Sequence, residues 1–535
     1  MQHVFIEYIF LILIIIALVM LSQRLKISYP IVLVLGGLVL SFTSPFSHVT
    51  IDPELIFFIF LPPLLYEAAW QTSWKEFYKW RRVITSFAFP IVILTSCVVA
   101  VVSSNLIPGF TMALGFLLGG IISPPDAISA TSIMRNVNAP KALVSIAEGE
   151  SLLNDASSLI VFRFAIAAVM TGQFVFSEAI GDFFLVIIMG VIVGIAIGFI
   201  FFAIHRWLPT TPSIDIVLSF ITPYCMYYFA ELFHFSGVIA VVCGGLLLSN
   251  QRQKMLTHLS RVQGANVWST VGFVLNGLVF LLIGLQLPTI VDQLEGISVQ
   301  TAIWYGLIIT LVLIITRLIC TLGASVFTTF MSRFITVADA NPGWKSPMVL
   351  GWAGMRGVVS LAMALSIPVA VTQGQAFPQR NLILFITFVV ILVTLVLQGL
   401  SLPWLIRKLK LEDKSLPPRQ QEAIILKKMA RASLSFLEER YGNSINANEH
   451  VRIMQSRLNI ELQFFTSQES VEILEKNPML EHQLISLEML EEQRKQLHKM
   501  NHRSEFDEDI IRKYLALLDL EETKLREKLP EGYKV

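Results

Sequence analysis

Long apolar stretches recur along roughly the first 405 residues of this chain, and they constrain its fold more than any other feature. The 535-residue sequence is 54% hydrophobic and only 15% charged, a composition typical of polytopic membrane proteins. A helix needs about 20 apolar residues to cross a bilayer. Windows of this length predict about thirteen spanning helices, near residues 4–22, 30–43, 53–70, 84–104, 110–134, 142–170, 182–206, 213–234, 236–250, 266–288, 300–330, 347–370 and 381–406.

The distribution of charge predicts the topology and the domain boundary. Lys and Arg fall in every second loop, whereas the loops at 44–52 and 103–109 contain neither. By the positive-inside rule, the N-terminus lies outside and the C-terminus lies in the cytoplasm. Charged residues are sparse up to Leu405 and dense afterwards, and apolar residues recur at helical spacing in this last part. We therefore predict a transmembrane domain over residues 1–410 and a cytoplasmic helical domain over residues 411–535.

Two of the predicted spans contain helix-breaking residues. The fifth span contains Pro124 and Pro125, and the twelfth contains Gly354 and Gly357. An odd number of spans allows two six-helix repeats of opposite orientation linked by one further span, and the two breaks then occupy corresponding positions. Paired breaks indicate a binding site at the membrane midplane, because broken helices expose carbonyl groups and helix ends to a water-lined cavity. The alternative is a packing kink at each position. We predict an all-α membrane protein with two inverted six-helix repeats and broken crossing helices.

Carboxylates lie near the centre of three predicted spans. A rise of about 1.5 Å per residue places Asp155 roughly 20 Å into the sixth span, Asp126 about 24 Å into the fifth and Glu67 about 21 Å into the third. Ionisable groups at this depth are costly unless they are paired or hydrated, so they mark an ion or proton pathway. Ser151 shares a helical face with Asp155, and Asn154 lies on the adjacent face. These five residues are the predicted ion-binding residues.

Glu150 and Arg356 are predicted to form a structural ion pair. They lie at similar depth, about 12 Å and about 13 Å from the cytoplasmic ends of their helices. A buried pair of this kind is more often structural than functional, because each charge compensates the other. Asp155 and Asp126, in contrast, have no basic residue at matching depth except Arg317. Unpaired carboxylates are free to bind a cation.

Competition between a proton and a cation for Asp155 is the simplest coupling that this arrangement permits. A carboxylate in a partly desolvated cavity can hold either one. Na⁺ and Li⁺ are hard ions that suit the oxygen atoms of Asp155, Asp126 and Ser151. One cation then exchanges for one proton by alternating access, which describes a secondary transporter and not an enzyme. The sequence has no Walker A motif, and we expect no cofactor and no nucleic-acid partner.

Three motifs carry a resemblance to a known family. They are residues 57–67, which end in Glu67, the central stretch 149–155, which ends in Asp155, and the Gly-x-Arg-Gly element 354–357. The chain resembles bacterial sodium/proton exchangers of the monovalent cation:proton antiporter superfamily over most of its first 405 residues. The resemblance implies a homodimer in the plasma membrane, with a dimerisation domain and a mobile core domain, that serves pH and sodium homeostasis. It also implies that Asp155 is an ion ligand and that Glu150 pairs with Arg356.

Two details concern the ion and the stoichiometry. Relatives commonly carry Asp followed by Pro, often after a Thr, whereas here Pro125 precedes Asp126, so a hydroxyl ligand expected at position 125 is missing. K⁺/H⁺ exchange therefore stays open as an alternative. Asn154 before Asp155 accompanies electroneutral exchange in the family, so we expect one-to-one electroneutral exchange.

Two alternatives from other classes are an intramembrane aspartyl protease that uses Asp126 and Asp155, and a non-transporting sensor with the C-terminal domain as its output.

Overall fold

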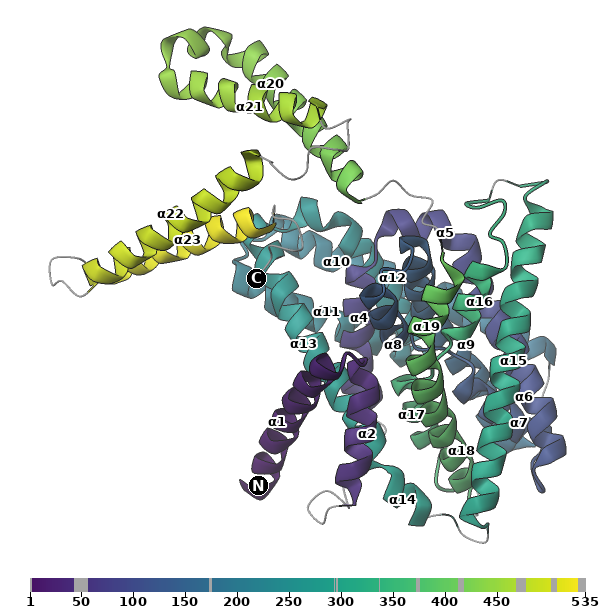
Figure 1. Cartoon of the computed structure of the whole chain (residues 1–535). Coiled ribbons are helices and arrows are strands. Elements are labelled where there is room, and N and C mark those ends of the chain that lie inside the picture. The colour runs from purple at the N-terminus through teal and green to yellow at the C-terminus, as the bar shows by residue number, and fades with distance from the viewer. Residues whose placement is uncertain are drawn as a thin grey trace. The chain divides into compact units, whose positions relative to one another are not determined.

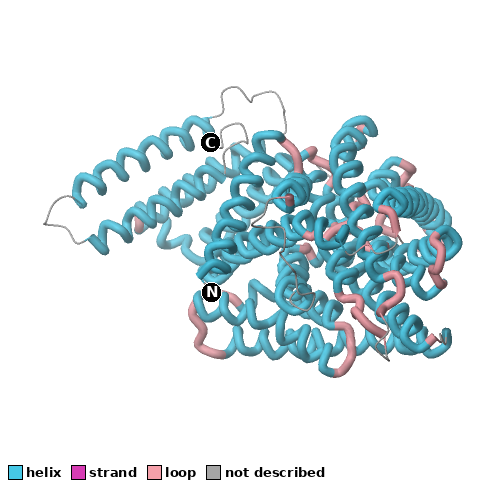
Figure 2. Tube along the Cα trace, turned by 90° about the horizontal axis from the view of Figure 1, so that it is seen from below, coloured by secondary structure: helices cyan, strands magenta, loops and turns pink. Residues whose placement is uncertain are grey.

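The computed structural model describes residues 2–42, 56–172, 176–292, 294, 297–335, 337–371, 376–411, 418–467, 478–501 and 508–527. The chain forms two compact units, Met1–Asp413 and Lys414–Val535. The described elements are helices joined by loops (Figures 1 and 2), so the predicted all-helical class is confirmed. The predicted loop 44–52 and the first residues of the predicted span 53–70 lie outside the described residues.

The first unit is a bundle of helices. Their order is α1 (Gln2–Leu25), α2 (Tyr29–Ser41), η1 (Ile56–Phe60), α4 (Leu61–Gln71), α5 (Trp74–Ser86), η2 (Phe87–Ile91), α6 (Val92–Leu106), α7 (Met112–Ile122), α8 (Ala127–Asn136), α9 (Lys141–Thr171), α10 (Phe176–Trp207), α11 (Pro212–Leu232), α12 (Gly237–Met255), α13 (His258–Leu285), α14 (Leu287–Asp292), α15 (Val299–Met331), α16 (Lys345–Trp352), α17 (Val358–Leu365), α18 (Arg380–Val393), η3 (Thr394–Gln398) and α19 (Gly399–Leu409).

Within the described residues, eight segments are long and apolar enough to cross a membrane, and two shorter apolar helices precede them. The most apolar windows of Met112–Asn136 and Arg380–Leu409 are 72% and 78% buried, whereas that of Gly181–Trp207 is only 17% buried. The segment that contains the first predicted break therefore lies in the centre of the bundle, and α10 lies at its periphery with an apolar surface exposed. Figure 1 shows α1 and α2 near one edge of this unit and α15 near the other.

Capping side chains and prolines determine where several helices begin. The Thr111 hydroxyl accepts a hydrogen bond from the Leu114 backbone N–H at the start of α7, and Thr257 caps α13 in the same way. Pro62 lies in the first turn of α4, at the point where the π-helical turn η1 passes directly into this helix. Pro90 lies inside η2, where the chain adopts a π-helical turn between α5 and α6.

Glycines allow α2 and α13 to pack backbone against backbone. A Cβ atom added at Gly284 would lie 2.2 Å from the Val34 carbonyl oxygen, and one added at Gly37 would lie 2.3 Å from the Leu281 carbonyl oxygen. In a membrane the hydrophobic effect does not drive helices together, so close contacts through small residues contribute much of the association. The α2–α13 pair therefore depends on these two glycines.

Gly284→Ala is expected to destabilise the first unit by about 1–3 kcal/mol, because the added methyl group would push α2 away from α13. Gly323→Ala is the matched control, since no atom of the described residues lies within 4 Å of a Cβ atom at Gly323 on α15. The measurement is thermal unfolding of the purified protein in detergent. Equal melting temperatures for the two variants would contradict the packing argument.

The second unit contains two pairs of packed helices. These are α20 (Pro418–Ala447) with α21 (Glu449–Ser467), and α22 (Pro478–Asn501) with α23 (Glu508–Glu527). Arg494 on α22 donates hydrogen bonds to Asp519 at 2.8 Å and to Glu522 at 2.6 Å, both on α23. The hydrogen bond from Arg494, with a further one from Arg526, holds the pKa of Glu522 below its ordinary value. This carboxylate therefore stabilises the α22–α23 pair in its charged form.

The sign of this pKa shift predicts how the pair responds to acid. Because the folded pKa is lowered, the contribution of Glu522 is fully present above pH 4.5, its ordinary pKa, and is lost as the pH falls through the lower folded value. Arg494→Gln should therefore reduce hydrogen-exchange protection of α22 and α23 at neutral pH, and less so at acidic pH. Arg512→Gln is the control, because Arg512 pairs within α23, with Glu508. A pH-independent effect of Arg494→Gln would contradict the assignment.

Candidate functional site

The chain leaves the helical conformation at both predicted breaks. Between α7 and α8 it runs through Pro124 and Pro125 without helical hydrogen bonds, and α8 begins only after Asp126. Between α16 and α17 it runs through Gly354 and Gly357. Each break leaves backbone polar groups without partners inside its own helix, and inside a membrane such groups need other partners.

The two broken segments contact one another directly. The backbone N–H of Asp126 donates to the Met355 carbonyl at 2.7 Å. The guanidinium of Arg356, which is 1% exposed, donates to the Ser123 carbonyl. A Cβ atom at Gly357 would lie 2.6 Å from Oδ2 of Asp126, so only glycine allows this close approach. The backbone groups freed by one break therefore bind the other break.

Asp126 caps the helix that begins at the first break. Its Oδ1 accepts a hydrogen bond from the Ile128 backbone N–H at 3.0 Å, and its Oδ2 accepts one from the Ser129 hydroxyl at 3.0 Å. A carboxylate at this position is stabilised by the free N–H groups and by the positive end of the helix dipole. Its role as the N-cap of α8 therefore determines both the position and the orientation of the Asp126 side chain.

Asp155 lies on α9 and faces the same space as Asp126. It is 8% exposed, and it lines a cavity of about 380 Å³ together with Asp126, Ser151 and Glu67. Asp155 and Asp126 are close enough to interact electrostatically. The other polar side chains that line this cavity are Tyr29, Gln71, Thr72, Thr131, Ser132, Arg135, Glu148, Ser269, Asn276 and Ser360. The structure thus places four of the five predicted ion-binding residues around one cavity.

Ser151 and Glu67 enter the cavity from different sides. The Ser151 hydroxyl accepts a hydrogen bond from the Ala127 backbone N–H at 3.3 Å, which links α9 to the start of α8. Glu67 on α4 accepts a hydrogen bond from Gln71 at 2.9 Å, and its carboxyl group packs against Gly272 of α13, where a Cβ atom would clash with it. Ser151 therefore belongs to the group of helices that carries Asp126 and Asp155, and Glu67 lies across from it.

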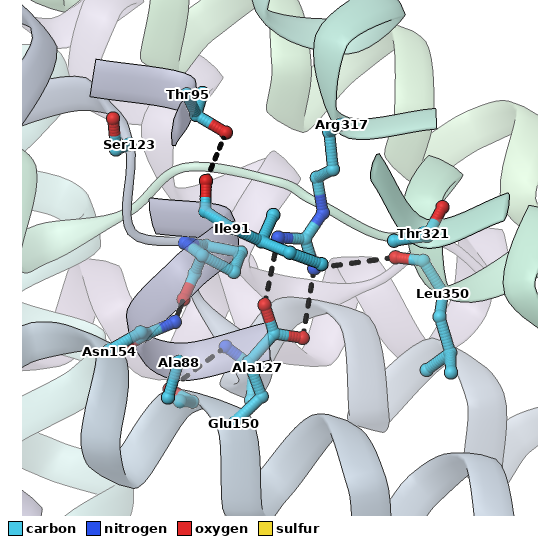
Figure 3. Close-up of polar contacts among 12 residues, drawn as sticks. Ala88, Ile91, Thr95, Ser123, Ala127, Glu150, Asn154, Arg317, Thr321 and Leu350 are labelled. Atoms are coloured by element: carbon cyan, nitrogen blue, oxygen red, sulfur yellow. Dashed lines mark hydrogen bonds and ion pairs between the residues drawn. The ribbon is translucent and has the colours of Figure 1, made fainter. Parts of the chain in front are cut away.

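Asn154, predicted to bind the ion, has a different position. It is fully buried, it does not line the cavity, and its amide nitrogen donates to the Pro125 carbonyl at 3.0 Å. Figure 3 shows Asn154 below the break, with its side chain turned toward the backbone that precedes Ala127. The prediction is corrected accordingly: Asn154 supports the broken stretch. A helical wheel places Asn154 beside Asp155, but it does not show which neighbour that face meets.

The predicted pairing of Glu150 with Arg356 is wrong. Glu150 pairs with Arg317 of α15 through two parallel hydrogen bonds of 2.8 Å and 2.9 Å (Figure 3). Both side chains are almost completely buried, at 2% and 4% exposed. Arg356 binds the Ser123 carbonyl instead. Equal depth along two helices does not decide which side chains face each other, and the two-pronged geometry of Arg317 satisfies both carboxylate oxygens.

Among the cavity residues that the sequence did not single out, Asn276 stands out because of its unpaired amide oxygen. Asn276 on α13 is 7% exposed, lines the cavity, and its amide oxygen has no hydrogen-bond partner among the described residues. Its signal in the sequence was a single amide inside the apolar run 271–285. Thus α13 contributes a polar side chain opposite Asp155.

The charges around the cavity differ in how they are compensated. The Glu150 carboxylate is neutralised by Arg317. Within the described part of the chain, no Lys, Arg or His forms an ion pair with Asp126 or Asp155, and the hydrogen bonds to Asp126 come from neutral donors. An arrangement of two carboxylates without a basic partner, beside hydroxyl groups, can bind a hard monovalent cation or protons.

Comparisons with known proteins agree with this arrangement. The sequence profile "Sodium/hydrogen exchanger, transmembrane" matches residues 9–408. The chain belongs to the sodium/hydrogen exchanger family. The predicted family and the predicted class, a secondary transporter and not an enzyme, are thereby confirmed, and the chain is a multi-pass membrane protein.

Individual relatives of this exchanger support the same family. It is 34% identical over 419 residues to a "Sodium, potassium, lithium and rubidium/H(+) antiporter" of Bacillus pumilus, a match that covers 76% of this chain and 61% of that protein. It is 32% identical over 391 residues to the "Low-affinity Na(+)/H(+) antiporter NhaS1" of Synechocystis, which covers 72% of this chain and 70% of that protein. The solved structure of the sodium proton antiporter MjNhaP1 from Methanocaldococcus jannaschii matches with a TM-score of 0.61 at 16% identity, over 77% of this chain and 100% of that chain. This last match shows a shared fold.

Neutralising one partner of the buried pair in this exchanger should destabilise it strongly. Glu150→Gln or Arg317→Gln leaves a buried charge uncompensated, which typically costs about 3–5 kcal/mol. We expect both single variants to give a low yield of folded protein, and the swapped double variant Glu150→Arg with Arg317→Glu to recover part of it. The swap between positions 150 and 356 is the matched control and should recover nothing. The measurement is the amount of monodisperse protein in size-exclusion chromatography. Better recovery by the 150–356 swap than by the 150–317 swap would contradict the pairing of Glu150 with Arg317.

Proposed function

We propose that this chain is an antiporter that exchanges Na⁺ or Li⁺ for H⁺ across the plasma membrane, with one cation exchanged for one proton. The observation that carries the proposal is the position of Asp126 and Asp155. Both carboxyl groups line one cavity at the crossing of two broken helices, and no ion pair compensates either of them in the described residues. Relatives of this chain bear the names of Na⁺/H⁺ antiporters.

Asp155, Asp126 and Ser151 are the proposed ligands of the transported cation, and Glu67 is a fourth oxygen donor from the opposite side of the cavity. Carboxylate and hydroxyl oxygens suit Na⁺ and Li⁺. A proton and a cation compete for the same carboxylates, and the empty, doubly charged site is the costly state inside a membrane. The loaded forms are therefore the ones that cross between the two sides, which couples the cation to the proton.

The proposed architecture has about thirteen spans in two inverted six-helix repeats. The broken pairs α7–α8 and α16–α17 support it, because an inverted-repeat transporter is expected to carry one broken helix in each repeat. With the N-terminus outside and the C-terminus in the cytoplasm, the cavity opens to the cytoplasm. Its mouth is formed by the exposed side chains of Arg135 and Gln71, at the end of the bundle where the sequence places the basic loops.

The proposal extends to the whole protein. We infer an antiporter domain over residues 1–410 and a cytoplasmic helical domain over residues 411–535. We also infer a homodimer that contributes to pH and sodium homeostasis, as the resemblance to the family implies. Potassium is named together with sodium in the B. pumilus relative, so K⁺ is included as a test ion.

Asp155→Asn should abolish cation-dependent proton movement in everted vesicles, because the amide can neither release a proton nor supply a full negative charge. Asp126→Asn should reduce it strongly. The measurement is dequenching of a pH-sensitive dye after addition of Na⁺, Li⁺ or K⁺, with and without a clamped membrane potential. Asn105→Asp is a matched control, since Asn105 is exposed at the end of α6 and does not line the cavity.

Each outcome of this experiment decides a part of the proposal. Exchange retained in Asp155→Asn would overturn the ligand assignment. A response of the unmodified protein to K⁺ but not to Na⁺ would replace Na⁺ by K⁺ as the substrate. A rate that changes with the clamped potential would overturn electroneutral one-to-one exchange.

A further inference from the structure

The cavity lies between two groups of helices, which we call its walls. The α4–α13 wall consists of α4 and α13, with Tyr29 of α2 beside them, and the α8–α9 wall consists of α8, α9 and α17. Each wall is packed within itself, since α4 packs on α11, α12 and α13, whereas α8 and α17 pack on α9. A passage to the opposite side of the membrane requires these walls to separate at the end away from the mouth.

Two hydrogen bonds show which ends of α11 and α12 lie away from the mouth. The Ser249 hydroxyl of α12 donates to the Trp70 carbonyl at 2.8 Å, at the mouth end of α4. The Tyr224 hydroxyl of α11 donates to the Ile59 carbonyl at 3.0 Å, at the other end of the η1–α4 segment. Glu231 follows Tyr224 by about two turns of α11, and this helix runs away from the mouth toward the start of α12. It therefore lies at the far end, opposite the mouth.

An ion pair joins the two walls at this far end. Arg163 on α9 donates a hydrogen bond to Oε2 of Glu231 on α11 at 2.6 Å. Arg163 lies about 12 Å beyond Asp155 along α9, on the side away from the mouth residue Glu148. The α9 partner thus belongs to the wall that carries Asp155, and the α11 partner lies on a helix that packs against α4 and α13 of the opposite wall.

The environment of this pair suits a contact that breaks and forms again. The side chains of Arg163 and Glu231 are 40% and 20% exposed, so neither is sealed in an apolar core. The second oxygen of Glu231 accepts a hydrogen bond from the Gly237 backbone N–H at 3.2 Å, at the start of α12. This carboxylate is therefore still held by a helix N-terminus when the arginine leaves it. The pair between Glu150 and Arg317, in contrast, is almost completely buried.

We propose that Arg163 and Glu231 form the gate that closes the cavity on the side opposite its mouth, and that this ion pair must break in each transport cycle. The inference rests on the proposed exchange function and goes beyond it by assigning the residues that control access from the far side. Neither residue lines the cavity, so they act on access and not on ion binding.

A reversible cross-link tests the gate directly. In the full-length chain, the native cysteines are first replaced by serine: Cys97, Cys225, Cys243 and Cys320. Arg163→Cys with Glu231→Cys is then joined by a short bis-methanethiosulfonate reagent in everted vesicles. We expect the cross-link to lower Na⁺/H⁺ exchange at least tenfold, and dithiothreitol to restore it.

The matched control joins α10 and α12 at a point away from the contact between the two walls. Arg206 at the end of α10 donates to the Lys254 carbonyl of α12 at 2.8 Å, and α10 packs on α12. Cross-linked Arg206→Cys with Lys254→Cys should exchange within twofold of its reduced form. Unchanged exchange in the cross-linked 163–231 variant, at a yield equal to that of the control, would overturn the gate.

Charge variants supply a second readout. Arg163→Gln and Glu231→Gln each remove the attraction that holds the far end closed, so the apparent affinity for Na⁺ added on the far side should rise about two- to fivefold. The affinity measured from the mouth side should fall or stay unchanged, and the swap Arg163→Glu with Glu231→Arg should return both toward the original values. Affinities unchanged from both sides in all folded variants would show a purely structural pair and overturn the gate.

The two proposals fail in different ways. Absence of exchange in the unmodified protein with Na⁺, Li⁺ and K⁺ would overturn the proposed function. Normal exchange in the unmodified protein and in the cross-linked 163–231 variant would overturn the gate alone. If the glutamine variants do not fold, the cysteine pair still tests the gate. Its form before cross-linking reports on folding, and its cross-linked form reports on the gate.

Discussion

The need to satisfy backbone hydrogen bonds inside the membrane determines the arrangement of this exchanger's centre. A broken helix frees N–H and C=O groups that lipid cannot satisfy. Here the N–H of Asp126 binds the Met355 carbonyl of the other break, and Arg356 and Asn154 bind carbonyl groups of the first break. Neither break is therefore stable without the other and without α9. The three segments form one interlocked unit, and Asp126 occupies its centre because it caps the helix that follows the first break.

This unit separates two roles for buried charge. Arg317 and Glu150 compensate each other across α15 and α9, which holds the outside of the interlocked unit together without leaving a free charge. Asp126 and Asp155 line the cavity, and hydroxyl and backbone donors orient Asp126 without a counter-charge. The same sequence stretch thus contributes one carboxylate to structure and another to the cavity, five residues apart on α9.

Sequence reasoning located the helix breaks and the carboxylates because proline, glycine and acidic residues stand out in apolar runs. It failed where the answer depended on which helices are neighbours. Depth along the helices matched Glu150 to Arg356 and placed Arg317 at the level of Asp155. Only the packing of α15 on α16 and against Gly354 of the second break brings Arg317 to Glu150. Asn154 was assigned to the cavity because helical spacing gives the face of a residue but not the element that this face meets. Asn276 was missed because a lone amide in an apolar helix is a weak signal without the cavity beside it.

The division of the proposed ligands between two walls has a mechanical consequence. Asp126, Asp155 and Ser151 all lie on elements that the crossing breaks bind together, whereas Glu67 lies across the cavity on α4. A displacement of one wall relative to the other would therefore carry three of the proposed ligands as a rigid group and change only their distance from the fourth. The proposed ion site would stay intact while its access changes sides, so the free-energy barrier would arise in the contacts between the walls. An ion pair at the far end, partly exposed and anchored on one side, is the kind of contact that can be exchanged for water at low cost.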